Sequence, residues 1–290
     1  MPILPIESID DPRVADYSQV REAELRADRF DAPGGLFIAE GELVIRRLLA
    51  SRYPIRSMLI TRARLATLAD LLTTLPGDVP VYLVEQHTMN AVVGFNIHRG
   101  ALAIGQRGPE PALHALLQPA RCAVILENLA NHDNLGGIFR NVAALGAGCF
   151  GRTCILLSPR CADPLYRKSI RVSMGAALQV PFATLNDWSG GLELLKQSGF
   201  HVIAMTPADD AQDIAQVAHR VATSGARPAI LLGAEGPGLS PESLRLADVR
   251  ARIPMPGRDD SAATLSPPDA AVDSLNVAVA CAISLHRLFH

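Results

Sequence analysis

The sequence predicts an α/β protein with two domains, the larger of which contains a parallel sheet. The chain has 290 residues, which allows one large domain or two ordinary ones, and 49% of them are hydrophobic, enough for a sizeable core. Short, continuously apolar runs alternate with segments of helical periodicity, a pattern typical of parallel strands covered on both faces. Residues 106–120 contain three prolines and a glycine and indicate a linker. We therefore expect a smaller N-terminal α/β domain over residues 1–110 and a larger domain over residues 120–290, with the boundary near 107–120.

The elements of the N-terminal domain follow from its apolar runs and from one two-faced segment. Residues 41–51, GELVIRRLLAS, predict a helix because Leu43, the Arg46–Arg47 pair and Leu49 divide two faces. The predicted strands cover 36–40, 55–61, 79–85 and 101–106, and a second predicted helix covers 62–75.

The C-terminal domain repeats this alternation. The predicted strands cover 122–128, 153–158, 200–206, 228–235 and 249–255, and the predicted helices cover 134–145, 168–179, 188–198 and 273–288. Ligands of parallel sheets bind beyond the carboxyl ends of the strands. Three of these strand ends continue into unusual loops, ENLANHDNLGG, GAEGPGLS and IPMPGRDDS.

Charge is nearly balanced, with 27 Lys+Arg and 29 Asp+Glu residues, so the net charge predicts no partner. The distribution of charge is more informative. Residues 43–69 contain six arginines and no acidic residue, and residues 160–171 contain four basic residues and one aspartate. Each cluster is either a surface for an anionic ligand or a solvated helix face, and the sequence leaves both interpretations open.

Cysteine usage and apolar runs argue against several protein classes. The five cysteines form no CxxC pair and have no histidine at ligand spacing, which indicates buried reduced thiols and no metal site. The start MPILPIESIDDP lacks the features of a signal peptide, and the run LNVAVACAISL is too short to span a bilayer. We expect a cytoplasmic protein with no membrane association. Residues 259–271, rich in Ala, Ser, Pro and Asp, predict a mobile loop.

Residues 146–151, GAGCFG, match the dinucleotide-binding pattern G-x-G-x-x-G. That motif requires a strand before it and a helix after it, whereas here the predicted helix comes first. We interpret the segment as a helix C-cap in which Gly146 or Gly148 adopts a positive φ. A nicotinamide-dependent oxidoreductase is the weaker alternative, since it depends on this segment alone.

Three short motifs carry polar groups near the predicted strand ends. NLGGIFR begins with Asn134 and ends with Arg140, an arginine in the first turns of an otherwise apolar helix. GAEGPGL offers the backbone groups of its glycines, with Glu235 in the same loop. The strand end IPM is rigid. In the helix that starts at DSLNV, Ser274 is well placed as the N-cap, whereas the amide of Asn276 needs polar partners.

The order and spacing of these motifs resemble the SpoU branch of the SPOUT RNA methyltransferases, across roughly residues 120–290. The family pattern N-x-G-x-x-x-R corresponds to residues 134–140, G-x-E-G-x-G corresponds to residues 233–238, and the third motif corresponds to IPM and SLNV. The segment LFIAEGELVIRRLL is similar to the family's N-terminal accessory domain, a small RNA-binding fold that resembles a ribosomal protein. Two features depart from the family pattern: the stretch 259–271, which bears on a lid over the cofactor, and Ala278, where the family often has serine.

The resemblance implies a deep trefoil knot in the C-terminal domain, a homodimer, S-adenosylmethionine as cofactor and RNA as partner. It implies methylation of a ribose 2′-hydroxyl in rRNA or tRNA, with rRNA slightly favoured by the accessory domain. It implies neither a metal nor a membrane. The alternative is a non-catalytic RNA-binding or ribosome-assembly factor that retains the knotted domain.

The resemblance also assigns residues. The implied catalytic residues are Arg140, Asn134, Glu235, Ser274 and Asn276. The implied cofactor-binding residues are Gly233, Glu235, Gly236, Gly238, Ile253, Met255, Leu275 and Asn276. The expected RNA-binding residues are Arg46, Arg47, Arg52, Arg167, Lys168 and Arg171. Arg140 acts either as a general base or, because guanidinium stays protonated in proteins, as a bidentate grip on phosphate that stabilises a developing alkoxide. We expect it at a helix N-terminus, which already favours anions.

Overall fold

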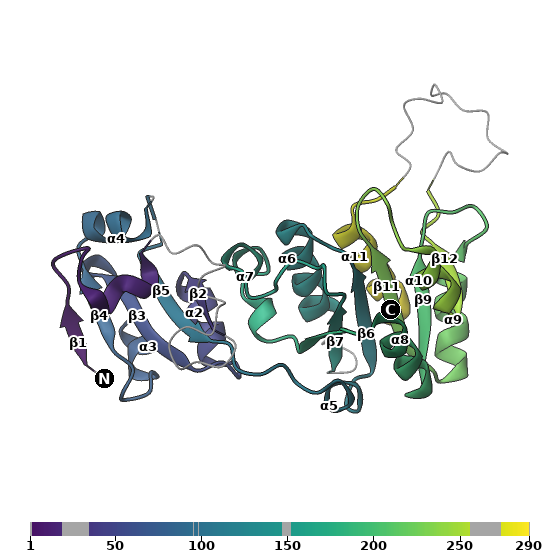
Figure 1. Ribbon diagram of the computed structural model, residues 1–290, viewed down its shortest axis with the longest axis horizontal. Helices are drawn as coiled ribbons and strands as arrows, with labels where there is room; N and C mark the ends of the chain where they lie inside the picture. The colour runs from purple at the N-terminus through teal and green to yellow at the C-terminus, as the bar shows by residue number, and fades with distance from the viewer. Residues whose placement is uncertain are drawn as a thin grey trace, which may run out of the picture. The chain divides into compact units, whose positions relative to one another are not determined.

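The computed structural model describes residues 2–18, 35–94, 96–97, 99–146, 152–255 and 274–289. These residues belong to two compact units, whose elements are labelled in Figure 1. Unit 1 comprises Met1–Pro109 and Asp163–Gln179, and unit 2 comprises Glu110–Ala162 and Val180–His290. The first long segment thus ends inside the predicted linker. Asp163–Gln179, which the sequence assigned to the larger domain, instead packs with unit 1.

Unit 1 contains a five-stranded mixed sheet in the order β1-β4-β3-β5-β2. Its strands are β1 (Ile3–Pro5), β2 (Leu36–Glu40), β3 (Ile55–Thr61), β4 (Val81–Val84) and β5 (Ala101–Gln106). Its helices are η1 (Pro12–Tyr17), α2 (Glu42–Leu49), η2 (Arg62–Arg64), α3 (Ala69–Thr73), α4 (Gln86–Val93), α7 (Arg167–Val172) and η4 (Ala176–Leu178). The predictions for β2, β3 and β5 are confirmed with these bounds. The single helix predicted over 62–75 is wrong, because two short helices occupy that stretch.

Unit 2 contains a seven-stranded sheet in the order β10-β12-β9-β11-β6-β7-β8. Every pairing in it is parallel, as the apolar runs predict. Its strands are β6 (Cys122–Glu127), β7 (Thr153–Leu157), β8 (Phe182–Thr184), β9 (Phe200–Met205), β10 (Gln212–Asp213), β11 (Arg227–Gly233) and β12 (Val249–Arg252). Its helices are α5 (Leu113–Leu117), α6 (His132–Asn141), η3 (Val142–Gly146), α8 (Trp188–Gln197), α9 (Ile214–Ser224), α10 (Pro241–Leu246) and α11 (Val277–Phe289).

The order of the strands creates a switch point between β6 and β11. The chain leaves β6 toward β7 on one side, and it leaves β11 toward β12 on the other side. In open parallel sheets, such a switch point opens a crevice beyond the carboxyl ends of the two strands. The loops that carry the predicted motifs NLGGIFR and GAEGPGL start at these two strand ends.

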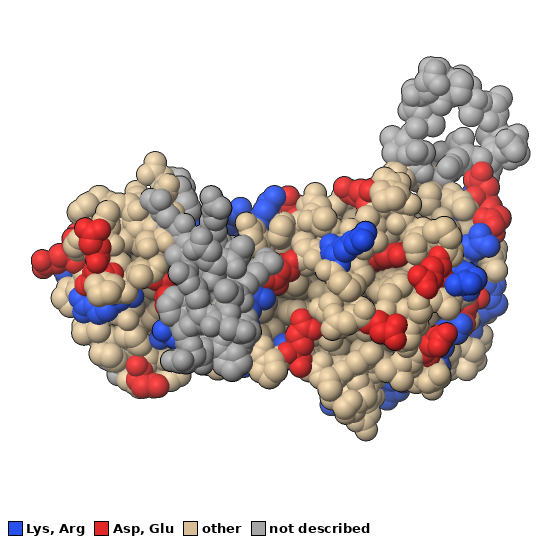
Figure 2. Space-filling view, in the orientation of Figure 1, with Lys and Arg blue, Asp and Glu red and all other residues tan. Residues whose placement is uncertain are grey.

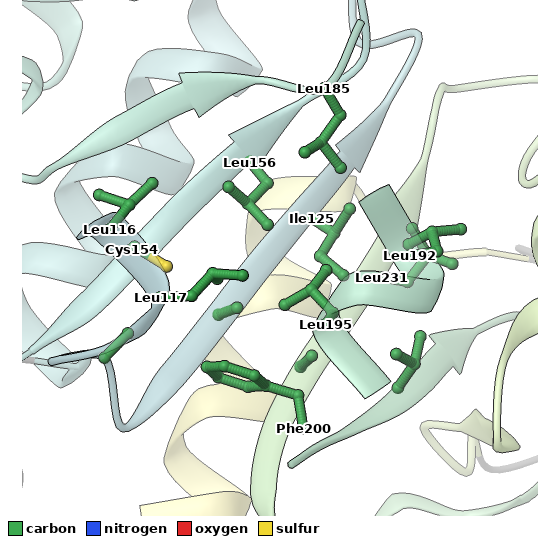
Figure 3. Packing of buried hydrophobic residues seen from close by; sticks show 14 of the residues in the cluster. Leu116, Leu117, Ile125, Cys154, Leu156, Leu185, Leu192, Leu195, Phe200 and Leu231 are labelled. Carbon is green, nitrogen blue, oxygen red and sulfur yellow. The ribbon is translucent and has the colours of Figure 1, made fainter. Parts of the chain in front are cut away.

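Alternating side chains of the sheet pack against helices on both of its faces. On β9, Val202 and Ala204 join a cluster with α5 and α8, whereas Ile203 joins a cluster with α9. Figure 3 shows Leu192 and Leu195 of α8 directed at the strand side chains of the first cluster. Both leucines are fully buried, and burial of one leucine side chain contributes about 1.5–3 kcal/mol. This core holds the strand ends in fixed positions.

The helix that carries the first motif begins and ends differently from its prediction. The Asn131 side chain caps its start by accepting hydrogen bonds from the backbone N–H groups of Asp133 and Asn134. At its end α6 widens into the π-helical turn η3, which finishes at Gly146. Gly146 has no positive φ. A Cβ there would lie 2.6 Å from the Thr153 hydroxyl, so close packing is the reason for this glycine. Gly148 and the stretch 259–271 lie outside the described residues.

Candidate active site

A cavity of about 510 Å³ lies at the carboxyl ends of β9, β11 and β12, next to the start of α11. Its volume is within the usual range for small-molecule sites. All of the predicted cofactor-binding residues line it: Gly233, Glu235, Gly236, Gly238, Ile253, Met255, Leu275 and Asn276. Three lining residues that the sequence did not predict are Met205, the last residue of β9, and Thr206 and Pro207, which follow it. Their signal was available, because they stand at the end of an apolar run in a parallel sheet.

The loop after β11 folds back on itself and presents its backbone to the cavity. The Gly238 N–H donates a hydrogen bond to the Ala234 carbonyl over 3.0 Å. Gly236 and Gly238 adopt φ values of 87° and 67°, which a side chain would strain. A Cβ on Gly233 would lie 2.3 Å from the Gly238 carbonyl carbon. The glycine pattern is therefore required by the turn itself.

Glu127 holds the far end of this loop. It is the last residue of β6, is 5% exposed, and accepts a hydrogen bond from the Ser240 N–H over 3.0 Å. Ser240 in turn caps α10 with its hydroxyl. Glu127 is not among the predicted residues, although an acidic residue that ends a continuously apolar strand is a recognisable signal. The loop is thus fixed at both ends, to β11 and to β6.

Asn134, Glu235 and Asn276 form one hydrogen-bonded cluster at the edge of the cavity. The Asn134 amide nitrogen donates to Glu235 Oε1 over 2.6 Å. The Asn276 amide nitrogen lies 2.9 Å from Asn134 Oδ1 and 3.1 Å from Glu235 Oε1. Asn134 is 7% exposed, so its amide requires these partners. The structure therefore brings together three predicted residues from three separate motifs.

The orientation of both amides is determined by the start of α11. Asn276 Oδ1 accepts the backbone N–H groups of Ala278, over 2.9 Å, and Val279, over 3.4 Å. This leaves the Asn276 nitrogen to face Asn134 Oδ1, and the Asn134 nitrogen to face Glu235. Glu235 Oε1 consequently receives two N–H donors, and no described residue donates to Oε2. The cluster holds one carboxylate in a fixed orientation, and among the described residues only its Oε1 is engaged.

Two predictions about this region are wrong. The helix begins at Val277 and Asn276 is its N-cap, so Ser274 is not the cap and instead lines the cavity. Arg140 lies in the last turn of α6, not in its first turns. Six residues along a helix correspond to about 9 Å of rise and to directions about 120° apart. Arg140 is therefore exposed at the opposite end of α6 from Asn134. Its charge suits that end, where the helix dipole favours cations.

The predicted RNA-binding arginines of α2 and its surroundings have partners within unit 1. Arg46 forms ion pairs of 2.8 Å with both Glu42 and Asp70. These two acidic residues flank the stretch 43–69. An arginine of a segment that contains no acidic residue is therefore neutralised by carboxylates just outside that segment. Arg47 donates to the Met174 carbonyl over 2.7 Å. On the face in Figure 2, basic and acidic side chains are correspondingly interspersed.

The second basic cluster lies on α7, which packs against β2 of the same unit. The Arg167 Nε donates to Glu40 over 3.1 Å, and its side chain is only 17% exposed. Arg171 lies 3.9 Å from the same carboxylate and is more exposed. Arg47 and the α7 segment are in contact, so both basic clusters belong to one region of unit 1. Within it Arg167 is a structural cation, held by Glu40.

The described cysteines form no disulfide. Cys122, Cys154 and Cys281 are buried, and burial raises the pKa of the Cys154 and Cys281 thiols to about 12. Across the described ranges there is no group of three or more His, Cys, Asp or Glu side chains able to hold a metal ion. Within the same ranges, no helix is long and apolar enough to cross a membrane.

Comparisons with known proteins agree with this arrangement. Residues 121–262 match the sequence profile of the SpoU rRNA Methylase family. A Mycobacterium tuberculosis protein described as an uncharacterized tRNA/rRNA methyltransferase is 41% identical over 284 residues, covering 96% of this chain and 88% of that protein. The tRNA (guanosine(18)-2′-O)-methyltransferase of Thermus thermophilus is 32% identical over 162 residues, covering 56% of this chain and 71% of that enzyme.

Solved structures share the fold over the whole chain. The crystal structure of the AdoMet-bound rRNA methyltransferase from Sinorhizobium meliloti superposes with a TM-score of 0.74 at 22% identity, covering 99% of this chain and 97% of that one. The chain therefore belongs to the SpoU rRNA methylase family of RNA methyltransferases.

Proposed function

We propose that the protein transfers a methyl group from S-adenosylmethionine to the 2′-hydroxyl of a ribose in rRNA or tRNA, with rRNA favoured. The observation that carries the proposal is the Asn134–Asn276–Glu235 cluster at the edge of the glycine-loop cavity. Two relatives support it. The T. thermophilus enzyme is named for 2′-O-methylation of a tRNA guanosine, and the S. meliloti protein is an AdoMet-bound rRNA methyltransferase.

The cavity fits this cofactor in size and chemistry. Leu232, Ile253 and Val277 contribute apolar surface for a planar base. The turns at Gly236 and Gly238 place backbone groups at the cavity, where they can bind polar ends of the ligand. Glu235 contributes a negative charge, which is complementary to a sulfonium. When bound, the cofactor supplies an electrophilic methyl group on a positively charged sulfur.

The side chains of the cluster hold and orient the attacking ribose. Asn134 and Asn276 fix Glu235 Oε1, and Oε2 is then the acceptor for a hydrogen bond from the 2′-hydroxyl. Such positioning replaces an unfavourable bimolecular encounter by a fixed geometry. The two amides contribute no charge of their own, so the carboxylate is the only ionised group of the cluster. Ser274 lies two residues before Asn276 and adds a hydroxyl group to the lining of the cavity.

Arg140 binds the RNA backbone in this proposal and does not contact the cofactor. It does not line the cavity, and it is exposed at the end of α6. A guanidinium there can bind a backbone phosphate of the RNA bidentately and so help to hold the reacting ribose in position. Lys168, Arg171, Arg47 and Arg52 of unit 1 add phosphate contacts farther along the RNA.

Two features implied by the family resemblance complete the proposal. The protein is a homodimer, and the chain of unit 2 is threaded as a trefoil knot. The knot depends on the path of residues 256–273, which are outside the described ranges. For the dimer, the exposed apolar side chains of Leu275 and Val279 at the start of α11 offer an interface.

The proposal is tested by incubating the purified protein with methyl-labelled S-adenosylmethionine and total RNA, followed by separation of rRNA from tRNA. We expect label in RNA, predominantly in the rRNA fraction. Binding of RNA and cofactor without incorporation would replace the proposal by the non-catalytic RNA-binding factor. Absence of S-adenosylmethionine binding in calorimetry would show that the cavity is not the cofactor site.

A further inference from the structure

A second hollow, of about 580 Å³, lies at the amino-terminal edge of the parallel sheet of unit 2. It is lined by Gln118, Pro119, Ala120, Arg121, Arg152 and Arg227. These residues come from the end of the α5 segment and from the starts of β6, β7 and β11, and Figure 1 shows α5 beside the starting end of β6. Three of the six residues are arginines and none is acidic. The hollow is at the opposite end of the strands from the candidate active site.

Arg227 forms a rigid wall of this hollow. Its Nη1 donates to the Leu117 carbonyl over 2.9 Å and to the Ala120 carbonyl over 2.8 Å, and its Nη2 donates to the Ser198 carbonyl. The guanidinium carbon lies 4.1 Å from the centroid of the Phe200 ring. All of these partners are electrically neutral. The side chain is therefore fixed in place, and none of the described residues forms an ion pair with it.

Arg121 and Arg152 add two further positive charges from neighbouring strands. The Arg121 N–H donates to the Arg152 carbonyl over 2.8 Å, so the two backbones are directly adjacent. Both residues are exposed. Across the described ranges neither side chain has an acidic partner, in contrast to Arg46 and Arg250, which do. Like charges gathered in this way repel one another, and the attraction of each to a bound anion offsets that repulsion.

We propose that this hollow binds a backbone phosphate of the substrate RNA, remote from the methylated ribose. The inference rests on the proposed function, since it takes RNA as the substrate. Guanidinium groups match phosphate geometry bidentately, and the hollow presents one fixed and two adjustable guanidinium groups. Strands of six or seven residues separate the hollow from the active site by about 20 Å at about 3.3 Å per residue. That distance corresponds to about six base pairs of duplex. The contact therefore increases the affinity for longer RNA and takes no part in methyl transfer.

The test compares Arg121→Gln, Arg152→Gln and the double variant with Arg245→Gln. Arg245 is an exposed arginine of α10 in the same unit that does not line the hollow, so its replacement makes the same change in charge as either single variant. We expect the double variant to bind a long RNA roughly tenfold more weakly and to lower the slope of log K against log salt by about one. Arg245→Gln keeps the wild-type slope. Turnover at saturating RNA and cofactor affinity stay unchanged, whereas the KM for RNA rises.

Several outcomes separate this inference from its alternatives. An RNA too short to span both sites should bind the wild type and the double variant equally. Equal binding of long RNA by the double variant and Arg245→Gln would overturn the inference. So would saturable binding of inorganic phosphate that is lost in the double variant while RNA binding is unchanged, because the site would then serve a free anion. If the wild type transfers no methyl group but the loss of RNA affinity is still found, the proposed function fails and the phosphate site stands.

Discussion

At the scale of single residues, Asn276 explains why the site needs an amide at this position. Its oxygen caps α11, and its nitrogen donates to Asn134 and Glu235. The sequence offers no structural reason for this asparagine and predicts Ser274 as the N-cap of the helix. In the structure, the amide oxygen of Asn276 forms the cap and its amide nitrogen joins the cluster. The folding of α11 and the orientation of Glu235 are therefore coupled.

Replacing Asn276 separates these two roles. Serine is as good an N-cap as asparagine but is too short to reach Asn134, whereas alanine loses both functions. We expect N276A to be about 1 kcal/mol less stable than N276S, measured by urea unfolding. Both variants should lose methyl transfer to a similar extent, because both lack the amide. If N276S were as active as the wild type, the amide would have only a capping role.

Arg140 is the residue whose location differs most from its prediction. Because it is exposed and does not line the cavity, Arg140→Ala should leave the thermal unfolding midpoint unchanged and cofactor affinity within a few-fold. Turnover on RNA should fall by roughly a hundredfold, because a ribose that is held less precisely reacts more slowly. Arg140→Lys should restore little of it, since a point charge does not replace a bidentate fork. Loss of cofactor binding in calorimetry would instead assign Arg140 to the cavity.

The residues of the site differ in how visible they are in the sequence. Asn134, Glu235 and Asn276 stand out because polar residues interrupt apolar or glycine-rich segments. Thr206 and Glu127 are less visible, because only their position at the end of an apolar strand marks them. Their importance comes from the order of the strands, which places the ends of β6, β9 and β11 side by side. Arg140 was misplaced because the start of α6 was predicted two residues too late and its end four residues too late.

At the scale of elements, alanine substitutions at two glycines of the loop after β11 should differ in their effect on cofactor binding. A Cβ at Gly233 meets the Gly238 carbonyl carbon at 2.3 Å, whereas a Cβ at Gly236 meets no atom within 4 Å and only strains a φ of 87°. Gly236→Ala should therefore cost about 1–2 kcal/mol of stability and weaken the cofactor modestly. Gly233→Ala must open the loop and should abolish cofactor binding in calorimetry. Equal effects of the two substitutions would mean that cofactor binding does not require the loop to fold back on itself.

The longer strands were predictable and the shorter elements were not. β2, β3 and β5 have continuous apolar runs and appear with the predicted bounds. β1, β8 and β10 contain only two or three residues, too few for any periodicity. The helices α9 and α10 were missed although Asp213 and Ser240 cap them with their side chains. Their starts carried a capping signal that apolar periodicity alone does not detect.

At the scale of the whole molecule, local patterns do not reveal which unit a segment joins. The Asp163–Gln179 segment connects β7 and β8 of unit 2 but packs with unit 1. Its attachment includes the Arg167–Glu40 pair and the Arg107–Asp163 pair, each between residues distant in sequence. Ion pairs of this kind cannot be read from spacing. The first pair also neutralises Arg167, one of the six residues predicted to bind RNA.

The homodimer can be tested through the exposed apolar side chains of α11. Light scattering at micromolar concentration should give twice the 30.9 kDa mass of one chain. Val279 is 47% exposed, and Val279→Asp should yield monomers because it buries a charge in the proposed interface. Leu43→Asp, at a similarly exposed apolar residue of unit 1, should leave the dimer intact. A monomeric wild type would contradict the proposed assembly.

The most direct test of the account is the chemical position of the transferred methyl group. RNA methylated by the purified protein is digested to nucleosides and analysed by mass spectrometry, in parallel with RNA treated with the Asn276→Ser variant. A cluster that orients a 2′-hydroxyl toward Glu235 predicts a nucleoside with the methyl group on its ribose and an unmodified base, and it predicts almost none of this product with the variant. A methyl group on the base, or full ribose methylation by the variant, would contradict the role given to Asn134, Glu235 and Asn276.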